Sequence, residues 1–175
     1  MDLELKGKTV FITGSTAGIG FATATALLNE GASVILNGRT SASVEAAIKR
    51  LEQKFPNETI IGIATDFSIL GEVNNLLENL PKIDILINNV GVYSSGSFFE
   101  TDDAEWYRQF EVNVMSGVRL SKSMLPRMFA NDWGRILFIS SECASLTPPD
   151  LIAYSMTKDA ILAVSRGLAQ LSKGT

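Results

Sequence analysis

The chain has 175 residues, a net charge of −4 and a sequence pI of about 4.9, which excludes nucleic acid as a main partner because phosphate backbones bind clustered Lys and Arg. It contains no histidine and a single cysteine, Cys143. The composition therefore excludes a Ser-His-Asp triad, a histidine-ligated metal site and an internal disulfide, and it favours a reducing compartment.

The N-terminal residues Met1–Lys6 carry two acidic side chains and no apolar run, so they do not predict a signal peptide. No stretch of the chain approaches the roughly 20 apolar residues that a membrane helix needs. We therefore expect a cytoplasmic protein with no membrane segment.

Short apolar runs alternate with longer helical patterns through the first part of the chain. Lys8–Thr13 (KTVFIT) predicts a strand, and Ile19–Asn29 predicts a helix. Ser33–Asn37 (SVILN) predicts a second strand, followed by a helix over Ser41–Phe55 with its first residue as the N-cap. Thr59–Ala64 (TIIGIA) predicts the third strand.

The same alternation continues in the second part of the chain. Ile69–Leu80 predicts a helix and Ile83–Ile87 (IDILI) predicts the fourth strand. A long helix is expected over Asp102–Phe129, then a fifth strand over Arg135–Ser140 (RILFIS). Leu151–Leu171 predicts the final helix.

Two of these helices carry further signals. Pro126 lacks a backbone N–H and is expected to disturb the long helix near its end. The final helix has an apolar stripe at helical spacing, which is expected to pack in the core; its members are Ile161, Val164, Leu168 and Leu171.

Strand and helix alternate throughout, and the strands are nearly continuous apolar runs. This pattern predicts a doubly wound, Rossmann-like α/β fold with a parallel sheet buried on both faces, in one domain over residues 1–175. That fold has two halves of three strands each, whereas the sequence predicts three strands and then two. We therefore expect the sequence to be part of a longer protein, truncated after the helix that follows the fifth strand.

A glycine-rich turn, Thr13–Gly20 (TGSTAGIG), separates the first strand from the first helix. Glycines at this place let the backbone approach a pyrophosphate, and the N–H groups at the helix start face its charge. The spacing G-x-x-x-G-x-G differs from the commoner G-x-G-x-x-G. A turn that binds no ligand is the alternative reading of this motif alone.

Three further strand ends carry polar residues. Arg39 follows the second strand, where an acidic residue would bind the ribose of NAD and an arginine accommodates the 2′-phosphate of NADP. Asp66, with Phe67 after it, offers a carboxylate to an adenine amino group or caps a loop. Asn89 and Gly91 follow the fourth strand, either at a cofactor crevice or in an ordinary turn.

Tyr154 and Lys158 lie four residues apart at the start of a predicted helix, and therefore on one face. An ammonium beside a phenol favours the phenolate, which makes a tyrosine usable as an acid and base near neutral pH. Ser141, at the end of the fifth strand, has a hydroxyl suited to bind a substrate carbonyl or alkoxide. Cys143 is expected to be a buried packing residue rather than a nucleophile.

In this order and on these elements, the motifs resemble those of the short-chain dehydrogenase/reductase family, over about Lys6 to Thr175. The resemblance implies that Tyr154 is the catalytic acid and base, that Lys158 assists it and binds the nicotinamide ribose, and that Ser141 orients the substrate. It also implies that Asn113, in the long helix, holds a proton-relay water. The cofactor-binding positions it implies are Gly14, Ser15, Thr16, Gly18, Ile19, Gly20, Arg39, Asp66, Phe67, Asn89, Gly91, Tyr154 and Lys158.

The expected function is hydride transfer between NADP(H) and a carbonyl or secondary alcohol, with no metal. NAD(H) stays open because Ala17 stands where many NADP-preferring members have a basic residue. The alternatives are a reductase of 3-oxoacyl chains on acyl-carrier protein, and a nucleotide-binding module or inactive fragment that turns nothing over. By resemblance, a homodimer or homotetramer is expected, with a small-molecule substrate as its other partner.

Overall fold

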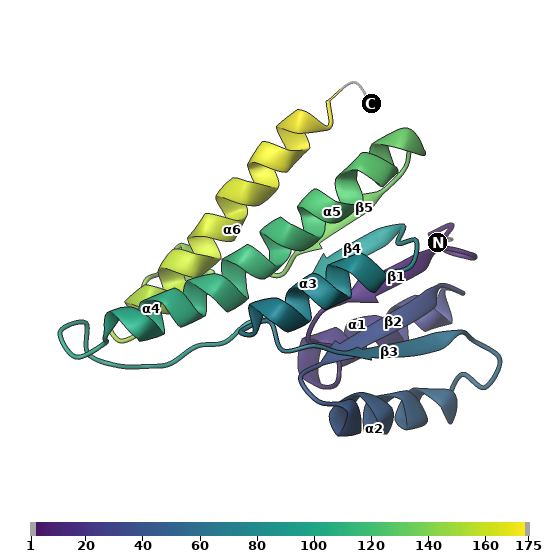
Figure 1. Ribbon diagram of the computed structural model, residues 1–175, viewed down its shortest axis with the longest axis horizontal. Helices are drawn as coiled ribbons and strands as arrows, with labels where there is room; N and C mark the ends of the chain where they lie inside the picture. The colour runs from purple at the N-terminus through teal and green to yellow at the C-terminus, as the bar shows by residue number, and fades with distance from the viewer. Residues whose placement is uncertain (1–2, 174–175) are drawn as a thin grey trace.

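Five apolar segments form a parallel sheet with the order β3-β2-β1-β4-β5 in the computed structural model, which describes residues 3–173 (Figure 1). The strands are β1 (Thr9–Ile12), β2 (Ser33–Gly38), β3 (Ile60–Ala64), β4 (Ile85–Asn88) and β5 (Arg135–Phe138). The expectations about the two chain ends rest partly on Met1, Asp2, Gly174 and Thr175, which lie outside the described residues. The sheet confirms the predicted doubly wound α/β class.

Helical segments connect the strands and cover the sheet. They are α1 (Gly18–Asn29), α2 (Ser41–Glu52), α3 (Leu70–Asn79), α4 (Asp103–Phe110), the π-helical segment η1 (Glu111–Met115), α5 (Ser116–Ala130), the 3₁₀ turn η2 (Glu142–Ala144) and α6 (Ile152–Leu171). Each predicted helix is present, with ends that differ by a few residues.

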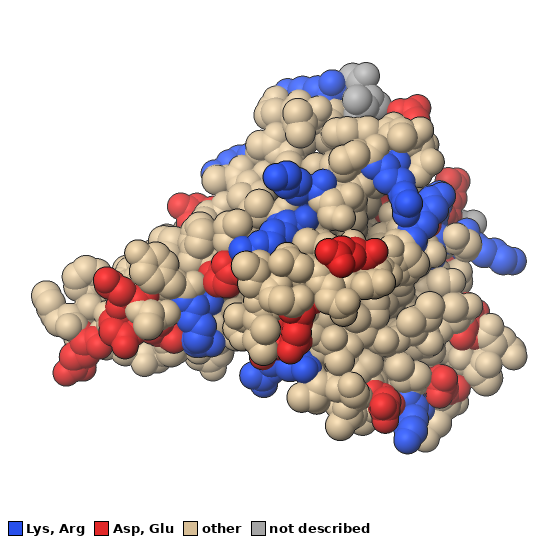
Figure 2. Space-filling model, viewed as in Figure 1, with Lys and Arg blue, Asp and Glu red and all other residues tan. Residues whose placement is uncertain are grey.

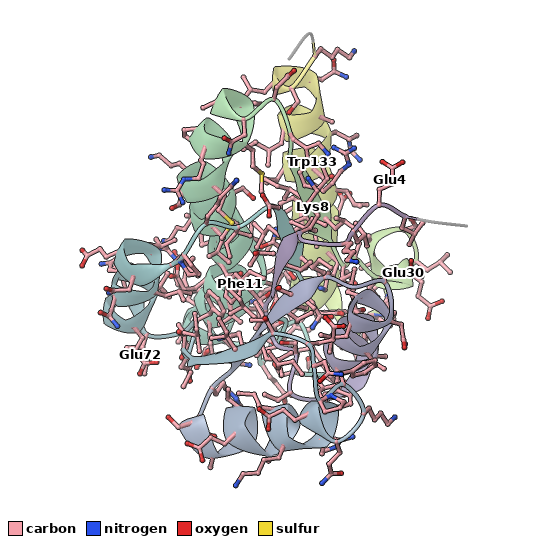
Figure 3. All side chains as sticks on the ribbon, turned by 90° about the vertical axis from the view of Figure 1, so that its right-hand side faces the viewer. Glu4, Lys8, Phe11, Glu30, Glu72 and Trp133 are labelled. Carbon is pink, nitrogen blue, oxygen red and sulfur yellow. The ribbon has the colours of Figure 1, made fainter. Side chains whose placement is uncertain are left out.

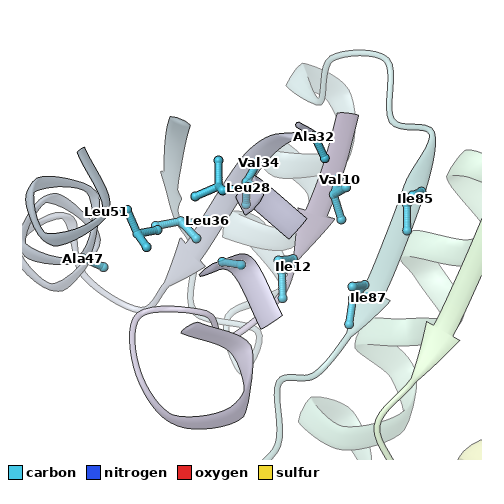
Figure 4. Close-up of a cluster of buried hydrophobic side chains, with 11 residues drawn as sticks. Val10, Ile12, Leu28, Ala32, Val34, Leu36, Ala47, Leu51, Ile85 and Ile87 are labelled. Atoms are coloured by element: carbon cyan, nitrogen blue, oxygen red, sulfur yellow. The ribbon is translucent and has the colours of Figure 1, made fainter. Parts of the chain in front are cut away.

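Alternation along the central strands builds a core on each side of the sheet. Val10 and Ile12 of β1 point into the cluster formed with α1 and α2 (Figure 4). Phe11, between them in sequence, points into the opposite cluster with α3, η1 and α5 (Figure 3). Because successive strand residues face opposite sides, these short apolar runs support two helix layers.

The sheet is buried on both faces only at its centre. Ile61 of β3 is 47% exposed and Leu137 of β5 is 45% exposed, whereas the side chains of β4 are buried. β3 and β5 are the outer strands of the described sheet. The expectation of burial on both faces is therefore correct for β1, β2 and β4 and wrong for the two outer strands.

The start of α2 corrects one predicted cap. Thr40, not Ser41, is the N-cap: its backbone is extended and its hydroxyl oxygen accepts a hydrogen bond from the Ser43 N–H at 3.2 Å. Ser41 is already the first helical residue. The two hydroxyl residues are adjacent, so the sequence alone does not separate them.

The long predicted helix is disturbed at Glu111–Met115 rather than at Pro126. The five residues of η1 form a π-helical turn between α4 and α5, while Pro126 lies inside α5. Lys122, whose carbonyl would have accepted a hydrogen bond from residue 126, is exposed. Water can therefore satisfy that carbonyl, and the proline is tolerated.

The apolar stripe of α6 is only partly a core stripe. Ile161 is 2% exposed, but Leu171 is 62% exposed. Val164, Leu168 and Leu171 line an apolar groove between α6 and α5. The prediction that all four stripe residues pack in the core was therefore wrong for Leu171, and α6 presents apolar side chains to this groove.

Acidic side chains gather at one end of the molecule, at the left in Figure 2, where Figure 1 places α4 and the loop before it. Glu100, Asp102 and Asp103 belong to this end, and they would repel a polyanion. Within residues 3–173, no helix is long and apolar enough to cross a membrane.

Candidate active site

The glycine-rich turn lies between β1 and α1, at the carboxyl end of the sheet. Gly14 and Gly18 have positive φ angles of 60° and 55°, a conformation that favours glycine. A Cβ on Gly18 would meet no atom within 4 Å, so the turn opens to the outside there. Ala17 precedes α1 and provides no side-chain cap, which leaves the first N–H groups of the helix available to an anion.

The inner side of the turn is fixed by a buried asparagine. The Asn37 Oδ1 accepts a hydrogen bond from the Gly14 N–H at 2.9 Å, and its Nδ2 donates to the carbonyls of Ile63 and Thr65 at 3.2 and 3.4 Å. Ser15 is fully buried, and its hydroxyl donates to the Ile12 carbonyl at 2.7 Å. The Ser15 side chain therefore supports the turn from within.

Gly20 closes the turn against the helix start. A Cβ at this position would lie 2.6 Å from the Gly14 carbonyl oxygen and 2.7 Å from Asn89 Nδ2. That Nδ2 donates to the carbonyls of Thr13 and Gly14, both at 2.9 Å. The Thr13 Oγ1 in turn accepts hydrogen bonds from the N–H groups of Asn89 and Val90, both at 2.9 Å. Asn89 is therefore part of the turn itself.

The ends of β2 and β3 bring Arg39 and Asp66 to the same side of the turn. Both hydrogen bonds from Ser68, at 2.7 and 2.9 Å, go to one carboxylate oxygen of Asp66. The hydroxyl of Ser68 is the main cause that lowers the pKa of Asp66, burial opposes it, and the charge of Arg39 adds to the lowering. Arg39 is exposed, whereas the Phe67 ring is 2% exposed and packs in the core, so Phe67 can offer a ligand only its backbone.

Lys158 is the most buried charged group of the site, with 4% of its surface exposed. Its Nζ donates to the Ile139 carbonyl at 2.9 Å and lies 5.6 Å from the centroid of the Tyr154 ring. Burial lowers the pKa of Lys158 because desolvation penalises its charged form. The lysine and the tyrosine therefore share one face of α6, as their spacing predicts.

Two hydroxyls hold this part of α6 in place. Ser140 donates from its Oγ to the Lys158 carbonyl at 3.0 Å, and Thr157 donates from its Oγ1 to the Tyr154 carbonyl at 2.7 Å. The Ser140 bond joins the segment after β5 to α6, and the Thr157 bond lies within the first turns of α6 itself.

Asn113 lies in η1 and connects it to two other segments. Its Oδ1 accepts from the Val92 N–H at 2.7 Å, and its Nδ2 donates to the Val92 carbonyl at 2.8 Å and to Thr157 Oγ1 at 2.9 Å. The side chain is therefore occupied by protein contacts, and the proton-relay water implied by resemblance stays a prediction. A Cβ on Gly91 would lie 3.4 Å from Lys158 Nζ and 3.6 Å from Asn113 Oδ1, so these three residues converge.

Ser141 precedes η2 and caps it. Its Oγ accepts a hydrogen bond from the Cys143 N–H at 3.2 Å, which leaves the hydroxyl hydrogen available to a substrate oxygen. Cys143 is buried, as expected of a packing residue. Within the described part of the chain, no three His, Cys, Asp or Glu side chains are grouped so that they can hold a metal ion.

Four residues of this network were not identified from the sequence: Thr13, Asn37, Ser140 and Thr157. Each is a common polar residue at or near a strand end, or between the two catalytic candidates. Their roles follow from contacts with segments 18 to 77 residues away, which no local pattern encodes.

Comparisons with known proteins agree with this architecture. The family model described as short chain dehydrogenase matches residues 8–175. YvrD, an uncharacterized oxidoreductase of Bacillus subtilis (strain 168), is 47% identical over 178 residues, which cover 100% of this chain and 66% of that protein. The 5-keto-D-gluconate 5-reductase of Escherichia coli (strain K12) is 31% identical over 171 residues, covering 94% of this chain and 66% of its own.

A solved structure is similar over nearly the same range. L-sorbose reductase from Gluconobacter frateurii, in complex with NADPH and L-sorbose, matches with a TM-score of 0.91 and 33% sequence identity. The match covers 97% of this chain and 66% of that one. The chain thus spans about 66% of the length of these relatives.

Proposed function

The chain belongs to the short chain dehydrogenase family, and we propose that it forms the nucleotide-binding and catalytic part of an oxidoreductase. The reaction is hydride transfer between NADP(H) and a carbonyl or secondary alcohol. The observation that supports this most strongly is the buried Lys158, held by Ile139 and facing the Tyr154 ring from one helical turn away. Burying a lysine carries a desolvation cost, and a buried lysine beside a partly exposed tyrosine suits proton transfer.

The residues fit a dinucleotide. The uncapped start of α1 and the open cradle at Gly18 suit a pyrophosphate, and the free carboxylate oxygen of Asp66 suits an adenine amino group. Lys158 of α6 and Gly91 after β4 lie side by side and suit the nicotinamide ribose. The bound cofactor supplies or accepts the hydride.

The proton chemistry belongs to the chain. In reduction, the Ser141 hydroxyl donates a hydrogen bond to the substrate oxygen, and Tyr154 transfers its phenolic proton to that oxygen. A protonated Lys158 favours the phenolate that remains. In oxidation, the phenolate removes the proton from the alcohol. Asn113 positions Tyr154 through Thr157: the Asn113 amide donates to the Thr157 hydroxyl, which in turn donates to the Tyr154 carbonyl.

Tyr154→Phe tests the assigned role of the tyrosine. The variant should bind NADPH as the wild type does, because the ring remains, but turnover should fall about 10²- to 10⁴-fold, the usual contribution of a general acid. NADPH fluorescence measures binding, and NADPH absorbance measures turnover. L-sorbose, 5-keto-D-gluconate and a 3-oxoacyl thioester form the first substrate panel. Turnover of the variant near the wild-type rate would refute the role.

Arg39 supports a preference for NADP over NAD, because no acidic residue ends β2 and the guanidinium is exposed. Arg39→Asp should weaken NADP binding about 10- to 100-fold, the loss expected for one charge-assisted contact of about 1.5–3 kcal/mol, while NAD binding stays or improves. Equal affinity of the wild type for the two cofactors, or tighter NAD binding, would reject the preference.

A nucleotide-binding role without turnover is the second candidate. It is supported by the glycine-rich turn alone, because the uncapped start of α1 and the open position at Gly18 suit a pyrophosphate whether or not Tyr154 acts on a substrate. NADPH binding with no turnover of any ketone or alcohol in the panel would select this candidate. Turnover of 3-oxoacyl thioesters alone would select the acyl-chain reductase instead.

We further propose a homo-oligomer in the cytoplasm. The groove between α5 and α6 presents the apolar side chains of Val118, Leu125, Val164 and Leu168, which suits a contact between copies. The cytoplasmic assignment rests on the single buried, unpaired cysteine. Leu168→Glu should shift a dimer or tetramer to monomer in analytical ultracentrifugation, and a monomeric wild type would reject the oligomer.

A further inference from the structure

Tyr93 presents a large aromatic surface beside Tyr154. The two ring centroids are 5.8 Å apart with the planes tilted by 59°, and Tyr93 is 68% exposed. Within residues 3–173 little of the ring's surface is removed from water, so packing inside this part of the chain does not account for the ring. We propose that Tyr93 is a specificity-determining residue whose ring binds the carbon substituent of the carbonyl substrate. This inference rests on the proposed oxidoreductase function.

The backbone before Tyr93 is fixed from inside the fold. Val92 is bonded through both its N–H and its carbonyl to the amide of Asn113, at 2.7 and 2.8 Å. Asn113 itself bonds Thr157, whose hydroxyl holds the Tyr154 carbonyl. The two tyrosines are therefore connected through one short chain of hydrogen bonds, in addition to their ring contact.

The backbone after Tyr93 is fixed from across the site. The Gly96 N–H donates to the Asp150 carbonyl at 2.9 Å, and the Ser95 hydroxyl donates to the Asp150 carboxylate at 2.7 Å. Asp150 lies two residues before α6, which carries Tyr154. The loop between β4 and α4 is thus attached to the start of α6 on the substrate side.

A second set of contacts attaches this loop to α4. The Ser94 hydroxyl donates to the Glu105 carboxylate at 2.5 Å, and Glu105 also accepts from the Arg108 guanidinium at 2.6 and 2.8 Å. The backbone is therefore held by hydrogen bonds on both sides of Tyr93, while the Tyr93 side chain itself is exposed. An aromatic group that is pre-positioned in this way loses little conformational freedom when a ligand covers it.

Distance sets which part of a substrate reaches the ring. The reacting oxygen must lie about 2.6–3.2 Å from the Tyr154 hydroxyl for proton transfer. The Tyr93 ring lies beside the Tyr154 ring, with 5.8 Å between the two ring centroids. A methyl group on the carbonyl carbon offers the ring little surface, whereas a longer alkyl substituent can lie across it and form several C–C contacts at about 3.5–4.0 Å. The ring therefore favours ketones with an extended substituent.

The test compares Tyr93→Ala and Tyr93→Phe, with Tyr107→Ala as the matched control. Tyr107 is a comparably exposed tyrosine, 72% exposed on α4, and it makes no ring contact with Tyr154. Among the described residues the Tyr93 hydroxyl makes no hydrogen bond, so Tyr93→Phe leaves no group unpaired. Acetone and 2-heptanone, reduced with NADPH, are the probes.

Tyr93→Ala should raise the KM for 2-heptanone about 3- to 10-fold, the loss expected for one aromatic contact. Its kcat should stay within about twofold, and its melting temperature should not change because the side chain is exposed. Acetone kinetics should be unaffected, Tyr93→Phe should resemble the wild type, and Tyr107→Ala should change nothing. An equal change for both ketones, an equal effect of Tyr107→Ala, or an unchanged KM for 2-heptanone would overturn the assignment.

Binding without turnover separates this inference from the proposed function. In the Tyr154→Phe background with NADPH, the dissociation constant of 2-heptanone is measured by saturation-transfer NMR, with and without Tyr93→Ala. A wild-type chain that reduces no ketone would contradict the proposed function. A 3- to 10-fold weaker affinity without the Tyr93 ring would still support the ring contact, and ketone binding that is absent or independent of the ring would overturn it.

Discussion

Gly20→Ala perturbs the point where the glycine-rich turn closes on α1. The added methyl would lie 2.6 Å from the Gly14 carbonyl oxygen, 2.7 Å from Asn89 Nδ2 and 2.8 Å from Ser15 Cα. Two of these three atoms belong to the backbone, and the third donates hydrogen bonds to the carbonyls of Thr13 and Gly14. No flexible side chain can move aside, so the turn itself must shift outward.

The expected cost follows from this geometry. Overpacking against atoms that cannot relax costs about 1–3 kcal/mol, and in a domain of this size each kcal/mol lowers the melting temperature by about 2–4 °C. Gly20→Ala should therefore melt about 2–12 °C below the wild type. A turn that moves outward also loses at least one hydrogen bond to phosphate, which should weaken NADPH binding about 10-fold or more.

Thermal unfolding by circular dichroism and NADPH fluorescence titration measure the two effects. Gly71→Ala is the matched control, because a Cβ there meets nothing within 4 Å and the residue lies in α3. That substitution should stabilise the protein by about 0.5–1 kcal/mol through helix propensity and leave NADPH affinity unchanged. Gly20→Ala with wild-type stability and wild-type affinity would refute the reasoning.

Three further predictions concern buried or paired polar groups. Burial lowers the pKa of Lys158 below 10.5, so between the folded-state pKa and 10.5 the unfolded state binds more protons than the folded state. The stability of the wild type should therefore rise with pH across this window relative to that of Lys158→Met. Urea unfolding at pH 7 to 10 tests this, and parallel curves of stability against pH would contradict it. The pKa of Glu105 is lowered to about 2 from 4.5, mainly by its hydrogen bond with Arg108. The stability that ionised Glu105 contributes to the fold should therefore be complete above pH 4.5 and lost as the pH falls toward 2. Urea unfolding at low salt should show this loss in the wild type and not in Glu105→Gln. Asn37→Leu should destabilise the protein by about 1–3 kcal/mol, since it leaves the Gly14 N–H unpaired, and an unchanged thermal midpoint would show that water replaces the bond.

The layered fold was predictable because the period of the hydrophobic pattern changes along the chain. Val10 and Ile12 face one helix layer and Phe11 faces the other, and a four-residue apolar run followed by a glycine-rich turn and a helix specifies a parallel connection. The partial exposure of Ile61 and Leu137 was not predictable, because the order of strands in the sheet, and not the sequence of one strand, decides which strands lie outside.

The π-helical turn was missed for a physical reason. The amide of Asn113 exchanges two hydrogen bonds with the backbone of Val92, 21 residues earlier, and a third joins it to Thr157. Through these contacts Asn113 faces the segment after β4 from within the π-helical turn, and no local sequence pattern encodes them. Pro126, the visible irregularity in the sequence, sits where solvent can replace the missing hydrogen bond.

The catalytic candidates were predictable from spacing, but their supports were not. A tyrosine and a lysine four residues apart share a helix face in any sequence. What makes Lys158 more than a surface lysine is its burial and its bond to the Ile139 carbonyl, and these depend on how α6 crosses the end of β5. Ser140 bonds α6 at that crossing and Thr157 joins α6 to η1 through Asn113, and neither is distinguishable from other serines and threonines before the chain folds.

The segment after β4 joins the two halves of the candidate site. The Asn89 side-chain amide donates hydrogen bonds to the carbonyls of Thr13 and Gly14 in the glycine-rich turn. Two residues later, Gly91 lies beside Lys158 Nζ and Asn113 Oδ1, which a Cβ at this position would approach to 3.4 and 3.6 Å. A shift of the turn must therefore move Asn89, and with it the backbone against which Lys158 is packed. Because one strand end supports both groups, occupation of the glycine-rich turn by a phosphate and the position of Lys158 should be energetically coupled, although no side chain spans the distance between them.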